Sequence, residues 1–442
     1  MASAAEQLAA NMSLSAFRTA DELKKRIWFT LAALLVYRLG TYIPLPGIDP
    51  QALQAVFNQQ QNGIVGMFNM FAGGAVGRMA IFALNIMPYI TASIVIQLLT
   101  SVVPRLEQLK KEGETGRKTI NQYTRYGTVL LATVQGYGIA VGLEGAEGVV
   151  VDPGVFFRVS AVITLVGGTV FLMWLGEQIT ARGVGNGISL IIFAGIVAEL
   201  PSALAGTLEL GRQGVLSTFI ILAMMVMVVA VIAFIVFMER AQRRLLVRYP
   251  KRQMGNKMTS GDSSHLPLKL NTAGVIPPIF ASSLLLMPVT LANFSSGEND
   301  MLASLAALLG RGQPAYMAMY AAGIIFFCFF YTSIVFNPND TADNLKRQGG
   351  FIPGIRPGQR TAKFIDRVLT RLTVVGALYL TLVCLLPEFL INAYNVPFYF
   401  GGTSLLIVVN VTMDTVGQVQ GHLFAHQYEG LIKKSKLGGK RR

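Results

Sequence analysis

The chain has 442 residues, of which 52% are hydrophobic and only 14% are charged, and its formal net charge is +14. Its mean hydropathy of +0.52 excludes an ordinary soluble domain, because soluble chains carry about 25% charged residues. The composition therefore predicts a polytopic membrane protein whose basic residues lie outside the membrane.

Apolar windows long enough to cross a membrane recur ten times along the chain. About 20 helical residues, rising about 1.5 Å each, cross a hydrocarbon layer of about 30 Å. The predicted spans cover residues 27–43, 80–103, 123–143, 155–176, 184–204, 215–238, 272–292, 315–336, 368–387 and 396–418. The predicted fold class is therefore an all-α polytopic membrane protein with ten transmembrane helices.

The basic residues are distributed asymmetrically along the chain. Of the 37 Lys and Arg residues, 32 lie in the N-terminal arm, the connections near 104–125, 239–270 and 337–371, the turn 177–184 and the tail. The others are Arg38, Arg78, Arg158, Arg212 and Arg311. Because basic loops are retained in the cytoplasm, both termini are predicted to be cytoplasmic, and an even number of spans satisfies this. The arm itself has acidic residues and lacks the apolar core of a signal peptide.

An additional apolar segment, residues 64–78, precedes the second span and interrupts its own helical pattern. Its glycines Gly73, Gly74 and Gly77 each destabilise a helix by roughly 1 kcal/mol. Arg78, at its end, is disfavoured at the membrane midplane. The pattern indicates a broken membrane segment.

Two cytoplasmic connections, residues 239–270 and 337–367, are too long to be simple turns. Their charges suit a topology signal that also binds anionic lipid head groups. The alternative interpretation is a surface that attracts nucleic acid or a ribosome, although no specific DNA binding is predicted. The stretch "GGFIPGIRPGQ" at 349–359 has the Gly and Pro content of a shaped, projecting loop, so we predict a docking surface.

Patterns typical of catalysis or metal binding are weak. Cys328 and Cys384 lie in apolar runs, where a thiol packs as a small hydrophobic group. His422 and His426 are four residues apart, but without a further ligand they favour a surface pair over a zinc site. The stretch "GETGRKT" at 113–119 lacks both the ending of a phosphate-binding loop and a preceding strand. We predict no enzyme activity, no cofactor and no metal.

A secondary solute transporter is the alternative function. Transporters place charged side chains near the bilayer midplane, where such costly groups serve the substrate pathway. The span centres here carry almost none, and hold amides instead: Asn85, Gln97, Gln135, Asn271 and Asn410. Amides form weak hydrogen bonds between helices, which suits surfaces that separate and rejoin.

Several long motifs resemble one family. They are "MFNMFAGGAVGRMAIFALNIMPYITASIVIQLL", "FLMWLGEQITARGVGNGISLIIFAGIV", "HLPLKLNTAGVIPPIFASS", "FFYTSIVFNPNDTADNLKRQGGFIPGIRPGQRTAKFIDRVLTRLT" and "VPFYFGGTSLLIVVN". Together they resemble the SecY/Sec61-alpha family of protein-conducting channels, from about residue 20 to the last span. The resemblance implies the central channel of the Sec translocon, which passes unfolded secretory polypeptides and releases transmembrane segments sideways into lipid.

The family's fold implies two pseudo-symmetric five-helix halves around an hourglass pore, here residues 1–205 and 206–442, hinged at the 200–214 loop. It also implies that residues 64–78 form a short half-helix, the plug, which folds into the channel from the external side. A re-entrant loop without a moving role is the other interpretation. The implied plug residues are Phe68, Asn69, Phe71, Gly73, Gly74 and Arg78.

The resemblance also implies an isoleucine ring at the waist of the pore and a lateral gate. The ring positions are Ile86, Ile90, Ile188, Ile192, Ile279 and Ile407. A narrow ring of branched aliphatic side chains resists wetting and so holds back ions. The gate positions are Thr91, Gln135 and Asn271. Their hydrogen bonds, worth about 0.6–2 kcal/mol in a membrane, are weak enough for a signal helix to open.

The partners follow from the same resemblance. The cytoplasmic loops resemble those that bind the SecA ATPase motor or a translating ribosome. The implied docking residues are Arg243, Arg244, Lys251, Arg252 and Arg356. SecE and SecG are the implied companion subunits, unfolded preproteins and their signal sequences are the passengers, and the bacterial plasma (inner) membrane is the implied location.

Overall fold

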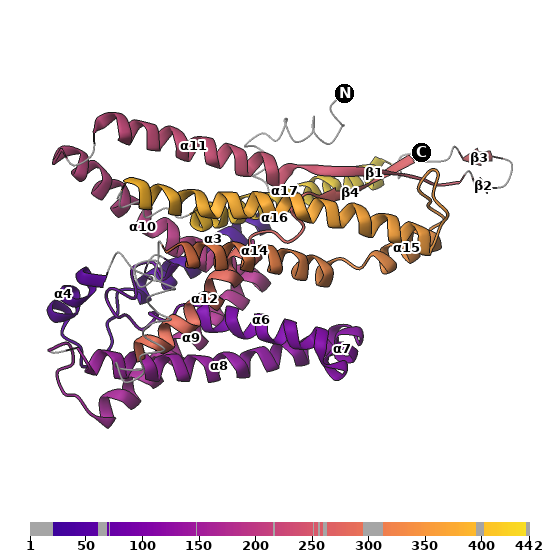
Figure 1. Cartoon of the computed structure of the whole chain (residues 1–442). Helices are drawn as coiled ribbons and strands as arrows, with labels where there is room; N and C mark the ends of the chain where they lie inside the picture. Colours follow the sequence, from indigo (N-terminus) through magenta and orange to yellow (C-terminus); the bar gives the residue numbers. More distant parts are fainter. Residues whose placement is uncertain are drawn as a thin grey trace. The chain divides into compact units, whose positions relative to one another are not determined.

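The structure is a computed structural model of the whole chain (Figure 1). It describes residues 21–60, 69, 71–146, 148–214, 217–250, 252–254, 257–259, 263–294, 313–394 and 402–438. The chain forms two compact units. Unit 1 comprises Met1–Tyr89, Arg125–Pro201 and Val411–Arg442, and unit 2 comprises Ile90–Thr124 and Ser202–Asn410. The predicted division into halves at residue 205 stays a prediction.

Helices make up most of the described chain. They are α3 Asp21–Gly40, α4 Pro50–Gln60, α6 Met87–Val102, α7 Pro104–Lys111, α8 Glu114–Glu144, α9 Val155–Arg182, α10 Gly187–Arg212, α11 Thr218–Arg240, α12 Ile276–Phe294, α14 Pro314–Val335, α15 Pro338–Arg347, α16 Gln359–Tyr394 and α17 Gly402–Gly438. A helix lies in each of the ten predicted windows, so the helical membrane fold is confirmed.

The described helices have the length and polarity of membrane spans. Six are individually long and apolar enough to cross a bilayer, and α6 with α7, joined through a 98° bend, makes a seventh. Helix α11 is the most apolar of them, and Ile235 is the residue that it buries. Large apolar side chains such as Phe219 and Val229 are exposed on it, which is the surface that lipid covers. The chain is a multi-pass membrane protein.

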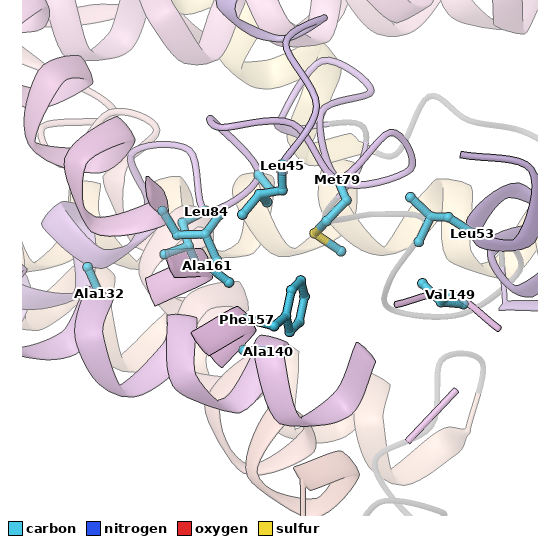
Figure 2. Packing of buried hydrophobic residues seen from close by; sticks show 11 residues of the cluster. Leu45, Leu53, Met79, Leu84, Ala132, Ala140, Val149, Phe157 and Ala161 are labelled. Carbon is cyan, nitrogen blue, oxygen red and sulfur yellow. The ribbon is translucent and has the colours of Figure 1, made fainter. Parts of the chain in front are cut away.

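In unit 1, a hydrophobic cluster packs the loop after α3 against α8 and α9. Figure 2 shows the Phe157 ring of α9 between Met79 and Ala140. The main chain adds two links, because the Leu45 amide donates to the Met79 carbonyl at 2.9 Å and the Ile81 amide donates to the Ile43 carbonyl at 2.9 Å. This cluster therefore fixes the chain just ahead of α6.

In unit 2, α14 packs against both α12 and α16. At the α12–α14 contact, the rings of Phe280 and Phe327 meet edge to face, with centroids 5.7 Å apart. Helix α11 continues directly into an antiparallel ribbon of β1 Gln242–Arg248 and β4 Ser263–Lys269 (Figure 1). Strands β2 Arg252–Met254 and β3 Lys257–Thr259 pair in the same way. The connection predicted as a loop is thus built from strands.

The connection at residues 200–214 was expected to be a loop that acts as a hinge, but most of it is helical. Helix α10 continues through Pro201 to Arg212, and α11 begins at Thr218. The Ala, Leu and Glu residues that follow Pro201 favour helix, which outweighs the single hydrogen bond that a proline removes. Helix therefore extends through this connection as far as Arg212.

Candidate functional site

The residues predicted to form the plug are only partly helical. Of the predicted half-helix at 64–78, the structure describes Asn69 and residues 71–78, and from Ala72 onward these residues form turns. Phe68 lies outside the described residues. The expectation of a half-helix is therefore wrong for residues 72–78. We call residues 71–86, which run from there to the start of α6, the turn segment.

Backbone conformation explains why the turn segment is not helical. Gly73 and Gly74 have φ values of +62° and +81°, a region that glycine adopts without steric cost. Met79 and Asn85 have φ values of +42° and +49°, which side-chain-bearing residues adopt only when surrounding contacts hold them. Helix α6 consequently begins at Met87, later than the predicted start of the second span at residue 80.

Polar side chains close the turn segment on itself. The Asn69 carbonyl accepts from the Gly74 amide at 2.8 Å, and the Asn69 side-chain oxygen accepts from the Gly77 amide at 2.7 Å. At the other end, the buried Asn85 donates its Nδ2 to the Phe71 carbonyl at 2.6 Å. These bonds satisfy backbone groups that would otherwise be buried without partners.

Two arginines hold the Gly73 carbonyl. Arg38, from α3, donates Nη1 to it at 2.6 Å, and Arg78 donates Nη2 to it at 2.9 Å. Both guanidinium groups also lie over the Tyr42 ring, 4.9 Å and 4.3 Å from its centroid. Charge-assisted bonds and cation–π contacts of this kind favour one position of the turn segment over others.

Helix α10 supplies a close backbone contact for the same segment. A Cβ at Gly195 would lie 2.6 Å from the Phe71 carbonyl oxygen and 3.0 Å from the Tyr37 hydroxyl. In turn, a Cβ at Gly73 would lie 3.1 Å from the Gly195 Cα. The absence of side chains at both positions lets the two backbones meet. Gly195 therefore acts as the seat of the turn segment on α10.

Gly73, Gly74 and Arg78 could be predicted from the sequence, whereas Arg38, Tyr42 and Gly195 could not. One signal was present, because Arg38 and Arg78 are two of the five basic residues that lie outside the basic connections, the arm and the tail. Basic residues in an apolar setting require partners. Gly195 gave no such signal, since its role depends on which chain segment passes across it.

The six predicted ring isoleucines are divided between the two units. Ile86, Ile188 and Ile192 belong to unit 1, and Ile90, Ile279 and Ile407 belong to unit 2. Ile86, Ile90, Ile192 and Ile407 are buried, whereas Ile188 and Ile279 are partly buried. None of the six is fully exposed, in contrast to the lipid-facing residues of α11. Their assembly into one ring stays a prediction.

The predicted gate residues have distinct environments. Asn271, ahead of α12, is buried, and its Nδ2 donates to Glu239 Oε1 at 2.6 Å. The buried Asn410 of α17 donates to the same oxygen at 3.2 Å. Gln135 of α8 has a buried side-chain oxygen without a hydrogen-bond partner among the described residues. Thr91 lies partly buried on α6. Sequence reasoning missed Glu239.

The predicted docking residues of the first long connection lie on the β ribbon. Arg243 and Arg244 are exposed on β1, opposite Leu268 and Pro267 of β4. Arg252 lies in β2, opposite Thr259, and Lys251 lies outside the described residues. Buried residues of the ribbon join residues of α15 and α16 in one hydrophobic cluster, which contains Leu245, Val247, Leu268, Leu345, Ile352, Ile365, Val368, Leu369 and Leu372. We call this cluster the hydrophobic base. The exposed arginines of β1 belong to a strand that is fixed to it.

Arg356 lies on a turn that belongs to the same base. Gly354 and Gly358, on either side of it, have φ values of +83° and +102°. The Arg356 carbonyl accepts from the Thr361 hydroxyl at 3.0 Å, and its own side chain is exposed. Backbone geometry therefore presents the guanidinium to the surroundings, as expected for a docking residue.

Metal and thiol chemistry has no site in the described part of the chain. It contains no group of three or more His, Cys, Asp or Glu residues that could hold a metal ion. Cys328 and Cys384 are both buried and unbridged, as predicted for small packing residues. His422 is exposed on α17, and nothing described contacts it as a ligand set would.

Comparison with known proteins gives consistent results. A protein-family model described as SecY matches residues 80–416. The protein translocase subunit SecY of Escherichia coli (strain K12) is 58% identical over 423 residues, which cover 95% of this chain and 96% of that protein. The shared sequence is therefore nearly the full length of both chains.

Solved structures share the fold at low sequence identity. One, described as the structure of a protein conducting channel, has a TM-score of 0.66 at 17% identity and covers 90% of this chain and 92% of its own. Another, Sec61 in the canine ribosome-channel complex from the endoplasmic reticulum, has a TM-score of 0.62 at 16% identity with the same coverage of both chains. At such identity the likeness concerns the arrangement of helices.

Proposed function

This chain belongs to the SecY family, and from that premise we propose how its residues conduct and release polypeptides. It is the protein-conducting channel subunit of a translocase, not an enzyme. Unfolded secretory polypeptides cross the membrane through it, and transmembrane segments leave it sideways into lipid. One observation supports this mechanism most directly. The turn segment, ahead of α6, is not helical, and it is held in place by separate hydrogen bonds.

The turn segment and the residues just before it form the plug. Its hold on the rest of unit 1 consists of a few hydrogen bonds, worth about 1 kcal/mol net for the one from Asn85 and about 1.5–3 kcal/mol for each of those from Arg38 and Arg78. A passenger chain that contacts the plug can replace those bonds with its own. The six isoleucines, which avoid exposure, form the narrow ring that seals around the passenger.

Thr91, Gln135 and Asn271 form the lateral gate. Each carries a side chain that can both donate and accept, and none carries a charge. An exchange of partners among such groups costs about 0.6–2 kcal/mol, so an apolar signal helix that enters the gate offsets that cost by its own transfer into lipid. The Gln135 side-chain oxygen, which has no hydrogen-bond partner in the described part of the chain, fits a residue whose partner changes between states.

The β ribbon and the Arg356 turn bind the partner that drives transport. Their arginines are exposed, cationic and fixed on one hydrophobic base, which suits the carboxylates of the SecA motor and the phosphates of a ribosome. SecE and SecG cover part of the apolar outer surface. The basic loops and both termini face the cytoplasm and its anionic lipids, and the membrane is the bacterial plasma (inner) membrane.

The experiment that tests this function uses the purified complex of this chain with SecE and SecG in proteoliposomes, supplied with SecA, ATP and a radiolabelled preprotein. The preprotein becomes protease-protected when the chain is a translocation channel, and it stays accessible without SecA. A solute transporter would instead leave the preprotein accessible and take up small solutes with saturable kinetics.

A further inference from the structure

Glu239, at the end of α11, connects three elements of unit 2. It is partly buried, and its Oε1 accepts from Asn271 ahead of α12 and from Asn410 of α17. The two donors are 32 and 171 residues away along the chain. A carboxylate that is withdrawn from water needs such donors, because an unpaired buried charge costs several kcal/mol.

The bonding of Asn271 fixes the orientation of its amide. Its Nδ2 donates to Glu239 and to the Gly274 carbonyl at 3.1 Å, and its Oδ1 accepts from the Gly274 amide at 3.1 Å. If the amide were rotated, Oδ1 would face the Glu239 carboxylate and a carbonyl, and three bonds would become repulsions. The carboxylate and the Gly274 main chain together therefore determine which end of the amide points toward α11.

This arrangement uses both amide hydrogens of Asn271. A primary amide has two N–H donors and two acceptor lone pairs. With both donors bonded inside unit 2 and one lone pair taken by Gly274, the remaining capacity is a single acceptor. A gate partner of Asn271 must consequently supply a hydroxyl or N–H donor, and Thr91 and Gln135 both carry one.

We propose that Glu239 is a positioning residue of the lateral gate: with Asn410 as its second donor, it orients the Asn271 amide as an acceptor and thereby sets how good a signal sequence must be to open the gate. This inference rests on the proposed gate role of Asn271. Glu239 acts on the gate through its bond to Asn271.

A reciprocal exchange of chemistry tests the proposal. Asn271→Asp places a second carboxylate against Glu239, so the two acceptors repel each other. In the double variant with Glu239→Gln, the new amide can turn its N–H toward the new carboxylate, which removes the repulsion between two carboxylates. The bond between the two side chains is then restored with donor and acceptor exchanged, while the bond to the Gly274 carbonyl stays lost. Glu209→Gln, on the exposed end of α10, is the matched control for loss of a carboxylate.

The measurement is translocation, by the reconstituted complex, of a preprotein with a defective signal sequence relative to the same preprotein with an intact one. The amount of membrane-integrated channel is quantified in parallel, because a merely structural defect lowers the translocation of both preproteins together. We expect Asn271→Asp to raise the ratio about tenfold and Glu239→Gln alone about threefold, from bond energies of about 0.6–2 kcal/mol. The double variant should return to within about threefold of the unchanged chain, and the control should not move the ratio.

Two outcomes overturn the proposal and differ in what else they overturn. If Asn271→Asp raises the ratio and Glu239→Gln does not restore it, the gate role of Asn271 stands and the positioning role of Glu239 falls. If Asn271→Asp and Asn271→Ala both leave the ratio unchanged in fully integrated protein, Asn271 is not a gate residue, and both assignments fall.

Discussion

Gly195→Ala is the substitution that probes the seat of the turn segment most directly. The added Cβ would lie 2.6 Å from the Phe71 carbonyl oxygen, whereas ordinary contacts begin at 3.4 Å. The turn segment must therefore move by about 0.8 Å, the difference of these two distances. The helix itself does not suffer, because alanine stabilises a helix interior by roughly 1 kcal/mol relative to glycine.

The displacement acts on the bond that closes the turn segment. Asn85 Nδ2 donates to the same Phe71 carbonyl at 2.6 Å, and a shift of about 0.8 Å along that line would stretch the bond to about 3.4 Å. Its loss, together with the contact at the Tyr37 hydroxyl, destabilises the seated position by about 1–2 kcal/mol. The population of the unseated plug should rise by a factor of about 5–30.

Resting ion conductance in planar bilayers measures that population. Gly206→Ala is the matched control, since Gly206 lies on the same helix and a Cβ there meets nothing within 4 Å. We expect a larger leak for Gly195→Ala and an unchanged leak for Gly206→Ala, with equal amounts of assembled protein. Equal conductance for the two variants would refute the reasoning, because it would mean that the seat does not control the seal.

Three further predictions concern the ring, the docking turn and the arginine pair. Ile86→Gly combined with Ile192→Gly removes two branched side chains that avoid exposure, and the resting channel should leak; loss of folding without a leak, measured by proteolysis beside conductance, would mark both as packing residues. Arg356→Glu should leave expression, topology and SecE association intact but abolish SecA-driven translocation in vesicles, whereas Lys436→Glu in the tail does little; equal, mild effects would reduce the first to an ordinary surface charge. Arg38→Gln removes one of two charged donors to the plug and should raise the resting leak about tenfold, with intact assembly; an unchanged conductance would assign the hold to Arg78 alone.

The sequence was sufficient for features that depend on local composition. Each predicted span contains a helix, because a long apolar stretch in lipid must bond its own backbone. The start of α6 was misplaced because residues 80–86 are as apolar as the helix that follows. Their turns depend on main-chain hydrogen bonds with residues 41–45 and on contacts with α3. No local sequence pattern encodes these contacts.

Pairings across long sequence distances were the part that could not be predicted. Asn271 was predicted to be a gate position from the resemblance alone, but its acceptor Glu239 lies at the charged end of another span, where the sequence shows only an ordinary flanking residue. The β ribbon was missed for a similar reason. The charged residues of β1 obscure the alternation of Leu245 and Val247, and the register with β4 is set by packing on α16.

The main-chain hydrogen bonds between the two long connections have a mechanical consequence. The Arg248 amide donates to the Phe351 carbonyl and the Phe351 amide to the Arg248 carbonyl, each at 2.9 Å, so the ribbon and the stretch before Arg356 form one stiff piece. That piece is continuous with α11 at one end and with α16 at the other. A load applied at the Arg356 turn, such as the proposed motor would exert, is therefore divided between two spans.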